Sequence, residues 1–258
     1  MKRVRFRDLA GAVRTGEWLD GDGDPADAAT AGTEAGTIRF GERKFDPASV
    51  DLLAPCQPTK IVCVGRNYAA HAEEFDSEVP ERPLLFLKGP NAVAPPNSDV
   101  SLLPGKERID YEAELGVVIG EQCRNVAEAD AMDVVAGYTG VNDLSNRDDQ
   151  REEQNWIRGK AFDGAAPLGP VVADPGHVPD DATIRLRHDG EVVQDSTIDR
   201  LFFGVPELIA EITTFLTLEP GDVIATGTPS GVGPVEPGDG VEVEIEGVGT
   251  LRHGIAPP

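Results

Sequence analysis

The segment at positions 111–120, YEAELGVVIG, carries two glutamates separated by a single residue. Side chains alternate between the two faces of a β-strand, so a strand here would project Glu112 and Glu114 from the same face. The opposite face would carry Tyr111 and four aliphatic side chains, which suits a hydrophobic core. Two like charges are costly to bury without partners, and a divalent cation would compensate both. The alternative is a polar face that meets water, and the strand alone leaves both open.

A third carboxylate, Asp143, follows a second predicted strand, VAGYTGVN at positions 135–142. Three carboxylates with open coordination positions suit Mg²⁺ or Mn²⁺, which prefer oxygen ligands and retain waters that a substrate can displace; Ca²⁺ is the alternative hard ion. The sequence has no HExxH motif and no Cys/His cluster, so zinc is not expected. Cys56, Cys63 and Cys123 lack metal-type spacing, and we expect them to be reduced and buried.

Further polar residues offer acid–base and anion-binding chemistry. His71 and Glu74 lie three residues apart in RNYAAHAEE, so a short helix would place them on one face, where they could act as a general-base dyad. Arg147 and Lys160 supply cations after the proposed metal ligands. Each also has an ordinary interpretation, because a single histidine is often structural and surface cations are common.

The elements that would position these residues are mostly short strands. We expect strands at 60–65, 84–88, 222–226, 240–245 and 250–252, with a hairpin joining 184–187 to 191–194. A helix at 205–215 is the clearest, with Leu208, Ile209, Ile212 and Phe215 on one side. A second helix is expected at 126–135, capped by Asn125. This pattern indicates an α+β fold that is predominantly β, with helices at its edges.

The N-terminal region and one loop are expected to be accessory. Residues 1–56 form a small module, with short strands at 4–6 and 37–40, before a catalytic domain at 57–258. The Pro-containing segment 75–83, directly after the proposed dyad, is expected to act as a lid over the site.

Composition excludes some partners. The chain has 258 residues and a formal net charge of −23, which disfavours nucleic acid and anionic membrane surfaces. The acids are spread throughout, a pattern typical of a protein from a high-salt, halophilic interior, where screening relieves self-repulsion. The N-terminus lacks the apolar run of a secretory signal, and no segment approaches the length of a membrane helix. We therefore expect a cytoplasmic protein with a small-molecule substrate.

Six segments occur in a characteristic order: GRNYAAHAEE, FLKGPNAV, DYEAELGVVIG, GYTGVNDLSNRDDQ, WIRGKAFDGAAPLGP and PGDVIATGTPSGVG. Together they strongly resemble the fumarylacetoacetate hydrolase family over about residues 57–255. The resemblance implies a mixed β-sheet roll with peripheral helices, like the C-terminal domain of that family, and a homodimer.

The resemblance also implies roles for the residues that match the family motifs. Glu112, Glu114 and Asp143 match its metal ligands, and His71 with Glu74 matches its water-activating dyad.

The substrate-binding residues of the family match four further positions. Lys160 matches the lysine of its GK-S-F motif, and Arg147 and Gln150 match the arginine and glutamine that grip the substrate. Thr228 matches the second threonine of its TGTP turn, which meets the substrate carboxylate.

Two positions depart from the family pattern. Ala161 stands where the family usually has serine, and Asn146 where it usually has alanine. Neither change removes a proposed ligand, but both leave fine substrate preference open.

The activity that the resemblance implies is metal-dependent hydrolysis of a C–C bond in 2,4-dioxo acids of the acylpyruvate or fumarylacetoacetate type, giving pyruvate-like products. The alternative is decarboxylation, isomerisation or dehydration of a related 2-oxo acid, of the oxaloacetate, 2-hydroxyhepta-2,4-dienedioate or 2-keto-3-deoxy sugar acid type. The presence of both His71 and Glu74 favours hydrolysis. A non-catalytic binding protein on the same fold is disfavoured because every proposed position is filled.

Overall fold

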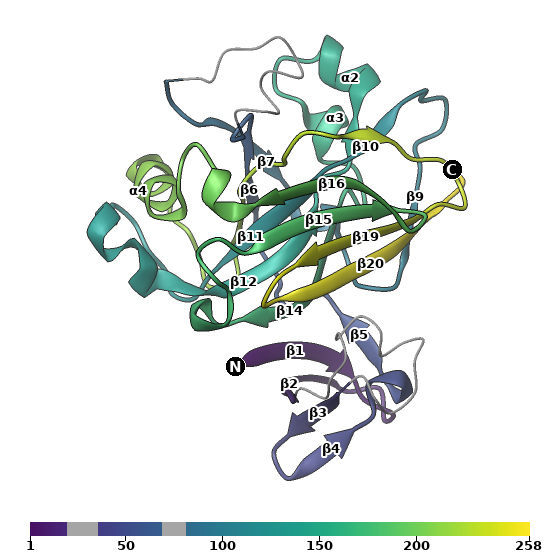
Figure 1. The fold of residues 1–258 in the computed structure, drawn as a ribbon, viewed down its shortest axis with the longest axis vertical. Coiled ribbons are helices and arrows are strands. Elements are labelled where there is room, and N and C mark those ends of the chain that lie inside the picture. Colours follow the sequence, from purple (N-terminus) through teal and green to yellow (C-terminus); the bar gives the residue numbers. More distant parts are fainter. Residues whose placement is uncertain (20–35, 69–80) are drawn as a thin grey trace.

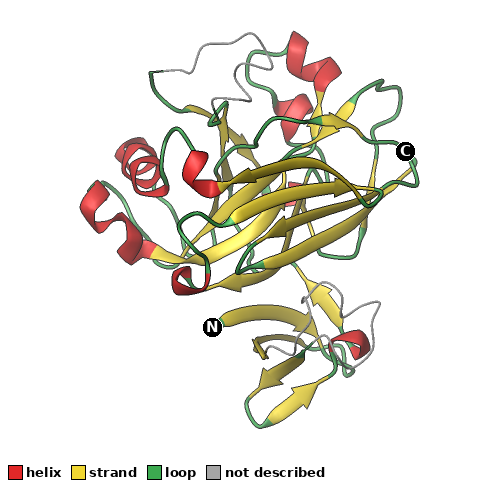
Figure 2. Ribbon diagram, viewed as in Figure 1, coloured by secondary structure: helices red, strands yellow, loops and turns green. Residues whose placement is uncertain are grey.

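The computed structural model describes residues 1–19, 36–68 and 81–258. Strands dominate these residues, and the few helices lie at the periphery (Figure 2). The predicted α+β, predominantly β class is confirmed. No helix in the described part of the chain is long and apolar enough to cross a membrane.

A mixed 12-stranded sheet forms the framework of the molecule (Figure 1). Its main path runs, in spatial order, through β4 (Arg43–Phe45), β3 (Thr37–Phe40), β2 (Val13–Leu19), β1 (Lys2–Arg7), β14 (Ala166–Ala173), β12 (Val135–Asn142), β11 (Ala113–Ile119), β17 (Val223–Ala225), β6 (Ile61–Gly65) and β7 (Leu84–Lys88). Off this path, β5 (Asp51–Leu53) pairs with β1 and β8 (Val93–Ala94) pairs with β14. Most pairs are antiparallel, but β17 runs parallel to β6.

Two smaller sheets complete the fold. A five-stranded sheet has the order β16 (Glu191–Thr197), β15 (Thr183–His188), β19 (Gly240–Ile245), β20 (Gly249–Ala256) and β9 (Asp99–Ser101). It lies against the part of the large sheet made by β11, β12 and β14 (Figure 1). A three-stranded sheet has the order β13 (Ser145–Asn146), β10 (Ile109–Tyr111) and β18 (Gly233–Pro234).

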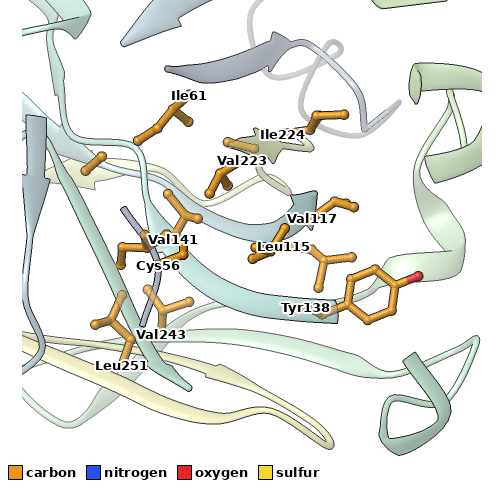
Figure 3. Packing of buried hydrophobic residues seen from close by; sticks show 14 of the residues in the cluster. Cys56, Ile61, Leu115, Val117, Tyr138, Val141, Val223, Ile224, Val243 and Leu251 are labelled. Carbon is orange, nitrogen blue, oxygen red and sulfur yellow. The ribbon is translucent and has the colours of Figure 1, made fainter. Parts of the chain in front are cut away.

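The hydrophobic core fills the space between the two larger sheets. Figure 3 shows Val243 and Leu251 of the five-stranded sheet facing Val141 of β12. Strand β11 pairs with β12 on one side and β17 on the other, and all seven of its residues are buried. Residues on both faces of β11 are therefore shielded from water, including those on the face that carries Glu114.

Helices are short and few among the described residues. The α-helices are α2 (Arg147–Glu152), α3 (Ile157–Lys160) and α4 (Val205–Phe215). The 3₁₀-helices are η2 (Pro47–Ser49), η3 (Pro90–Ala92), η4 (Glu128–Val134), η5 (Pro175–His177) and η6 (Ile198–Arg200). Helix α4 has the predicted bounds and buries Leu208, Ile209 and Ile212. Phe215 was expected on the same buried side, but its position at the end of the helix leaves it 54% exposed.

Two sequence-based expectations are wrong in detail. The segment 126–135 forms the 3₁₀-helix η4 in place of an α-helix, and its N-cap is Ala127. Asn125 adopts a left-handed conformation (φ 52°), and its N–H donates to Thr213 O at 2.9 Å, so a contact with α4 replaces the capping role. The segment 111–120 is not one strand, because β10 ends at Tyr111 and β11 begins at Ala113.

The N-terminal strands predicted at 4–6 and 37–40 are confirmed within β1 and β3. Strand β1 joins the sheet of the larger region through the pairs Lys2↔Ala173 and Arg3↔Val172 on β14. The large sheet therefore continues into the N-terminal region, and the boundary at residue 56 stays a prediction.

Candidate active site

The break between β10 and β11 brings two of the proposed ligands together. Glu112 lies in the break, and its N–H donates to Asn142 Oδ1 at 2.8 Å. Its carbonyl oxygen accepts from the N–H of Asp143 at 2.9 Å. The chain leaving β12 is thus held beside Glu112 by a pair of hydrogen bonds, which places the carboxylate of Asp143 next to that of Glu112.

Glu114 is anchored from the opposite side by the loop after β17. Its Oε2 accepts from the N–H of Gly227 at 2.9 Å. Gly227 has φ +101°, and a Cβ there would lie 2.8 Å from Asn67 Cβ, so only glycine suits this position. The glycine lets the loop approach closely enough for its backbone to bind the carboxylate.

The three carboxylates form one buried cluster. Each of Glu112, Glu114 and Asp143 offers an oxygen, and these oxygens all lie within 4.8 Å of one another. The three residues are 4%, 2% and 1% exposed, respectively, so the alternative of a strand face that meets water is wrong. The predicted proximity of the three side chains is confirmed.

Lys160 compensates two of these charges. Its Nζ donates to Glu112 Oε2 at 2.7 Å and to Asp143 Oδ2 at 2.8 Å, and it lies 4.9 Å from the centre of the Phe86 ring. Burial alone would lower the pKa of the Lys160 ammonium, but the carboxylates of Asp143 and Glu112 outweigh that effect and raise it. Lys160 therefore stays charged and holds the two carboxylates in place.

Lys88, at the end of β7, is a fully buried cation that the sequence did not predict as part of the site. Its Nζ donates hydrogen bonds to the carbonyl oxygens of Leu144 at 3.1 Å, Ala165 at 2.9 Å and Lys160. Its Nζ also lies 2.7 Å from Asp143 Oδ1. That oxygen is buried and accepts no hydrogen bond among the described residues. The ammonium has three hydrogens, and three carbonyl oxygens already accept from it. Asp143 thus keeps a charge-compensated oxygen with free lone pairs.

Glu114 differs from its two neighbours. Among the described residues, no cation lies within ion-pair distance of its carboxylate. Burial raises its pKa well above the ordinary value, and the nearby carboxylates of Asp143 and Glu112 raise it further. Three buried carboxylates, one of them without a cation and another with an unused oxygen, are a donor set that fits a hard divalent cation such as Mg²⁺ or Mn²⁺.

Helix α2 presents Arg147 and Gln150 to the same site. Asn146 caps the helix, because its Oδ1 accepts from the N–H of Asp148 at 3.1 Å. The Arg147 guanidinium donates from Nε to Asp110 Oδ2 at 2.8 Å, from Nη2 to Glu112 Oε1 at 2.6 Å and from Nη1 to Gln150 Oε1 at 2.7 Å. The departure from the family pattern at Asn146 is therefore a helix cap that orients the helix carrying both residues.

Helix α3 ends at Lys160 and packs closely on α2. A Cβ on Gly159 would lie 3.0 Å from the backbone N and Cα of Gln150, so glycine allows this approach. The close packing brings the ammonium of Lys160 next to the cluster that Arg147 reaches from α2.

Thr228 lies in the loop after β17, one residue beyond Gly227. Its Oγ1 accepts a hydrogen bond from Gln194 Nε2 at 2.9 Å. The side chain of Gln194 is buried, and Thr228 faces the cavity described next.

A cavity of about 280 Å³ opens onto these side chains. Four acids and five cations line it: Asp110, Glu112, Glu114, Asp143, Arg66, Arg108, Arg147, Arg151 and Lys160. Gln150 and Thr228 add polar contacts, and Phe86 and Trp156 add aromatic surface. The volume suits a small molecule, and the wall is rich in cations although the chain carries a net charge of −23.

Seven of the nine residues predicted from the sequence therefore surround this cavity: Glu112, Glu114, Asp143, Arg147, Gln150, Lys160 and Thr228. The other two, His71 and Glu74, lie outside the described residues, as does most of the segment predicted to form a lid.

Several contributors to the site were not predicted, namely Lys88, Asp110, Asn142 and Gln194. Lys88 stands in the FLKGPNAV segment, where a lysine that ends an apolar strand is a signal of a buried, paired cation. Asn142 and Asp110 are sequence neighbours of predicted ligands. Gln194 lies in a hairpin far along the chain, and nothing in its local sequence marks it.

Comparison with known proteins shows which family has this sequence and site. Residues 60–256 match the family model described as fumarylacetoacetate (FAA) hydrolase C-terminal. The 4-hydroxyphenylacetate degradation bifunctional isomerase/decarboxylase of Escherichia coli is 48% identical over 199 residues, which cover 76% of this chain and 46% of that protein.

Solved structures agree with this assignment. The 5-carboxymethyl-2-hydroxymuconate delta-isomerase of Mycobacterium smegmatis is 37% identical with a TM-score of 0.88, over 100% of this chain and 99% of that chain. The fumarylpyruvate hydrolase of Pseudomonas aeruginosa, in complex with Mn²⁺ and pyruvate, is 35% identical with a TM-score of 0.72, over 86% of this chain and 95% of that chain. With its mixed sheets, its buried acidic cluster and these matches, the chain belongs to the fumarylacetoacetate hydrolase family.

Proposed function

We propose that this family member uses a divalent cation to act on 2-oxo acids, and that it hydrolyses a C–C bond in 2,4-dioxo acids. The observation that carries the proposal is the buried cluster of Glu112, Glu114 and Asp143, which opens onto a small cavity rich in cations. Glu112, Glu114 and Asp143 would hold the ion. A divalent cation bound there would act as a Lewis acid on the 2-oxo group and stabilise the charge of an enolate.

The charge of the cavity wall supports an anionic substrate. The acids Glu112 and Asp143 already pair with Lys160, and Asp110 pairs with Arg147. The wall has four acids and five cations, and a divalent cation would increase this positive excess. A 2-oxo acid carries the complementary carboxylate, which charge-assisted hydrogen bonds would hold strongly.

Arg147, Gln150 and Thr228 are proposed to orient that carboxylate. The guanidinium of Arg147 is fixed by three contacts, so its charge is preorganised and needs no rearrangement on binding. Gln150 accepts from Arg147 through Oε1, which leaves its amide nitrogen as the donor toward a ligand. Lys160 would hold Glu112 and Asp143 in position and add positive charge beside the reacting carbonyl.

In the proposed hydrolysis, a water oxygen attacks the C4 carbonyl of the 2,4-dioxo acid. The C3–C4 bond then breaks, its electron pair forms the enolate of pyruvate, and a proton at C3 completes pyruvate while C4 leaves as a carboxylic acid. His71, oriented by Glu74, is proposed to take the proton from the attacking water. This role follows from the family motif, and both residues lie outside the described part of the chain.

Isomerisation or decarboxylation of a related 2-oxo acid is the second candidate. The names of the Escherichia coli isomerase/decarboxylase and the Mycobacterium smegmatis delta-isomerase support it. Both reactions use the same enolate stabilisation but need no attacking water.

One experiment separates the two candidates. Purified protein is assayed with Mg²⁺ on an acylpyruvate and on oxaloacetate, in the wild type, His71→Ala and Glu74→Gln. Hydrolysis predicts that His71→Ala lowers kcat on the acylpyruvate by about 10²–10⁴-fold while oxaloacetate decarboxylation changes little, with a smaller loss for Glu74→Gln.

Two results would contradict the hydrolase proposal. One is wild-type turnover of oxaloacetate but of no acylpyruvate, which would favour the second candidate. The other is an equal, small loss on both substrates in His71→Ala, which would remove His71 from the catalytic residues.

A further inference from the structure

Gln194 connects two parts of the site that come from different regions of the sequence. It lies on β16, is 1% exposed and does not line the cavity. Its Oε1 accepts from the N–H of Ala113 at 3.0 Å. Its Nε2 donates to Pro229 O at 2.8 Å and to Thr228 Oγ1 at 2.9 Å. One buried amide thus links Ala113, which lies between Glu112 and Glu114, to the loop that carries Thr228.

The orientation of this amide is determined by its two backbone partners. The N–H of Ala113 can only donate, and the carbonyl of Pro229 can only accept. Rotating the amide by half a turn would set donor against donor at Ala113 and acceptor against acceptor at Pro229. The group that faces Thr228 is therefore the N–H, which is a donor.

This orientation determines what Thr228 can offer to a ligand. Because its Oγ1 accepts from Gln194, the hydroxyl hydrogen of Thr228 is left to donate elsewhere. No acceptor for that hydrogen is found among the described residues, and Thr228 lines the cavity. The hydroxyl is thus set to donate to an acceptor in the cavity.

We propose that Gln194 is a positioning residue that presets the Thr228 hydroxyl as a donor to the carboxylate of the 2-oxo acid. The inference rests on the proposed function, because it assumes that this carboxylate is the acceptor in the cavity. Gln194 also fixes the position of the loop after β17 relative to the strand that carries Glu114, because the same amide accepts from the N–H of Ala113.

The variant Gln194→Glu tests this role with a side chain of the same shape. One carboxylate oxygen still accepts from Ala113, but the other has no hydrogen to donate to Thr228. The Thr228 hydroxyl then donates to that carboxylate and is lost to the ligand. Gln57→Glu, at an exposed position, is the matched control for the added charge.

The measurement is pyruvate binding to the Mn²⁺-saturated protein by isothermal titration calorimetry, with Mn²⁺ binding measured separately. Gln194→Glu is expected to weaken pyruvate binding by about 10-fold or more, as for a lost hydrogen bond to a charged group, with Mn²⁺ affinity within about 2-fold of the wild type. Gln57→Glu is expected to leave both affinities unchanged.

A double-variant cycle tests whether Gln194 acts through Thr228. Thr228→Val should weaken pyruvate binding to a similar extent, Thr228→Ser should retain it, and Gln194→Glu should add little in the Thr228→Val background. If the buried carboxylate prevents folding, Gln194→Met serves as an uncharged second variant with the same expected loss of pyruvate affinity.

The inference is overturned if Gln194→Glu or Gln194→Met binds pyruvate like the wild type. It is also overturned if the losses multiply in the double variant, or if Mn²⁺ affinity falls in parallel with pyruvate affinity. Because the readout is binding, an inactive wild type on acylpyruvates would refute the hydrolase proposal without deciding the role of Gln194.

Discussion

At the scale of single residues, the site is a set of buried charges that depend on one another. Glu112 and Asp143 have Lys160 between them, whereas among the residues that the structure describes Glu114 accepts a hydrogen bond only from the N–H of Gly227. Breaking a buried ion pair from one side leaves the other charge uncompensated, which costs more than the pair itself contributes. Substitutions at this cluster should therefore act on metal affinity and on stability in distinguishable ways.

Glu114→Gln should weaken divalent metal binding, because it replaces a carboxylate ligand by a neutral amide. Replacing a residue that only hydrogen-bonds to a metal ligand typically lowers metal affinity by roughly 10–100-fold. Replacing a ligand itself should lower Mn²⁺ affinity by at least this much. Calorimetric titration of Mn²⁺ measures it, and Asp130→Asn, at an exposed acid on η4, is the matched control. Unchanged Mn²⁺ affinity in Glu114→Gln would remove Glu114 from the ligand set.

Lys88→Met should lower stability strongly. The change leaves three backbone carbonyls without their donor and removes the cation beside Asp143. Removing one partner of a buried charge costs about 3–5 kcal/mol, and we expect a loss of this size in the free energy of unfolding by urea. Lys44→Met, at an exposed lysine on β4, should change it little. A loss below about 1 kcal/mol for Lys88→Met would contradict the account, since that is the range of exposed pairs.

At the scale of elements, β20 supports the ligand-bearing strands through a buried histidine. Nε2 of His253 lies 2.8 Å from Asn142 Nδ2, and the Oδ1 of Asn142 accepts from the N–H of Glu112. Nδ1 of His253 lies 3.2 Å from Gly254 O. The two contacts suit a neutral imidazole that accepts at Nε2 and donates at Nδ1.

This histidine should make stability depend on pH. Burial lowers the pKa of His253 from 6.5 to about 4, so between these values the unfolded chain binds the proton and the folded protein does not. The contribution of neutral His253 to the free energy of unfolding is fully present above pH 6.5. It is lost as the pH falls toward 4, by about 3 kcal/mol in total.

The measurement is the free energy of unfolding by urea at several pH values between 7 and 4. His253→Gln, which keeps an acceptor for Asn142 but cannot titrate, should lose less stability over this range than the wild type, by up to that amount. His177→Gln, which changes an exposed histidine and leaves His253 in place, is the matched control. Equal slopes in His253→Gln and the wild type would show that His253 is not buried in its neutral form.

Element boundaries show how far local sequence determines structure here. The helix at 205–215 and the strand at 135–142 were predictable because apolar residues recur with the periods of those elements. The η4 segment and the break at Glu112 were not, because each depends on a contact with a distant element: Asn125 with Thr213, and Glu112 with Asn142. Tertiary contacts override local propensity at such points.

At the scale of the whole molecule, the net charge of −23 is the dominant feature. Like charges on a compact surface repel one another, and salt screens that repulsion, with a Debye length that falls from about 10 Å at 0.1 M to about 3 Å at 1 M. The thermal unfolding midpoint should therefore rise from low to molar KCl. Equimolar NaCl should give a similar rise if screening is the cause. A midpoint that does not change would refute the inference of adaptation to high salt.

The candidate site was predictable only in part. Residues close together in the sequence or within family motifs could be predicted, and residues from distant strands could not. Glu112 and Glu114 are two residues apart, so a strand interpretation keeps them close, although a break at Glu112 interrupts the strand; the family motifs supply Asp143, Arg147 and Lys160. Lys88 and Gln194 come from other strands and enter the site through buried hydrogen bonds to backbone groups. No spacing within one segment predicts such contacts, because the whole fold must form before they exist.

Glu112, Glu114 and Asp143 are proposed to hold a divalent cation that binds a 2-oxo acid. The most direct test is a crystal structure of the protein with Mn²⁺ and pyruvate, with the metal located by its anomalous scattering. We expect one Mn²⁺ peak with an oxygen of each of the three carboxylates within ligand distance, and the pyruvate carboxylate directed toward Arg147 and Thr228. A peak at another place, with the three carboxylates bound only to Lys160, Lys88 and Arg147, would contradict the proposal.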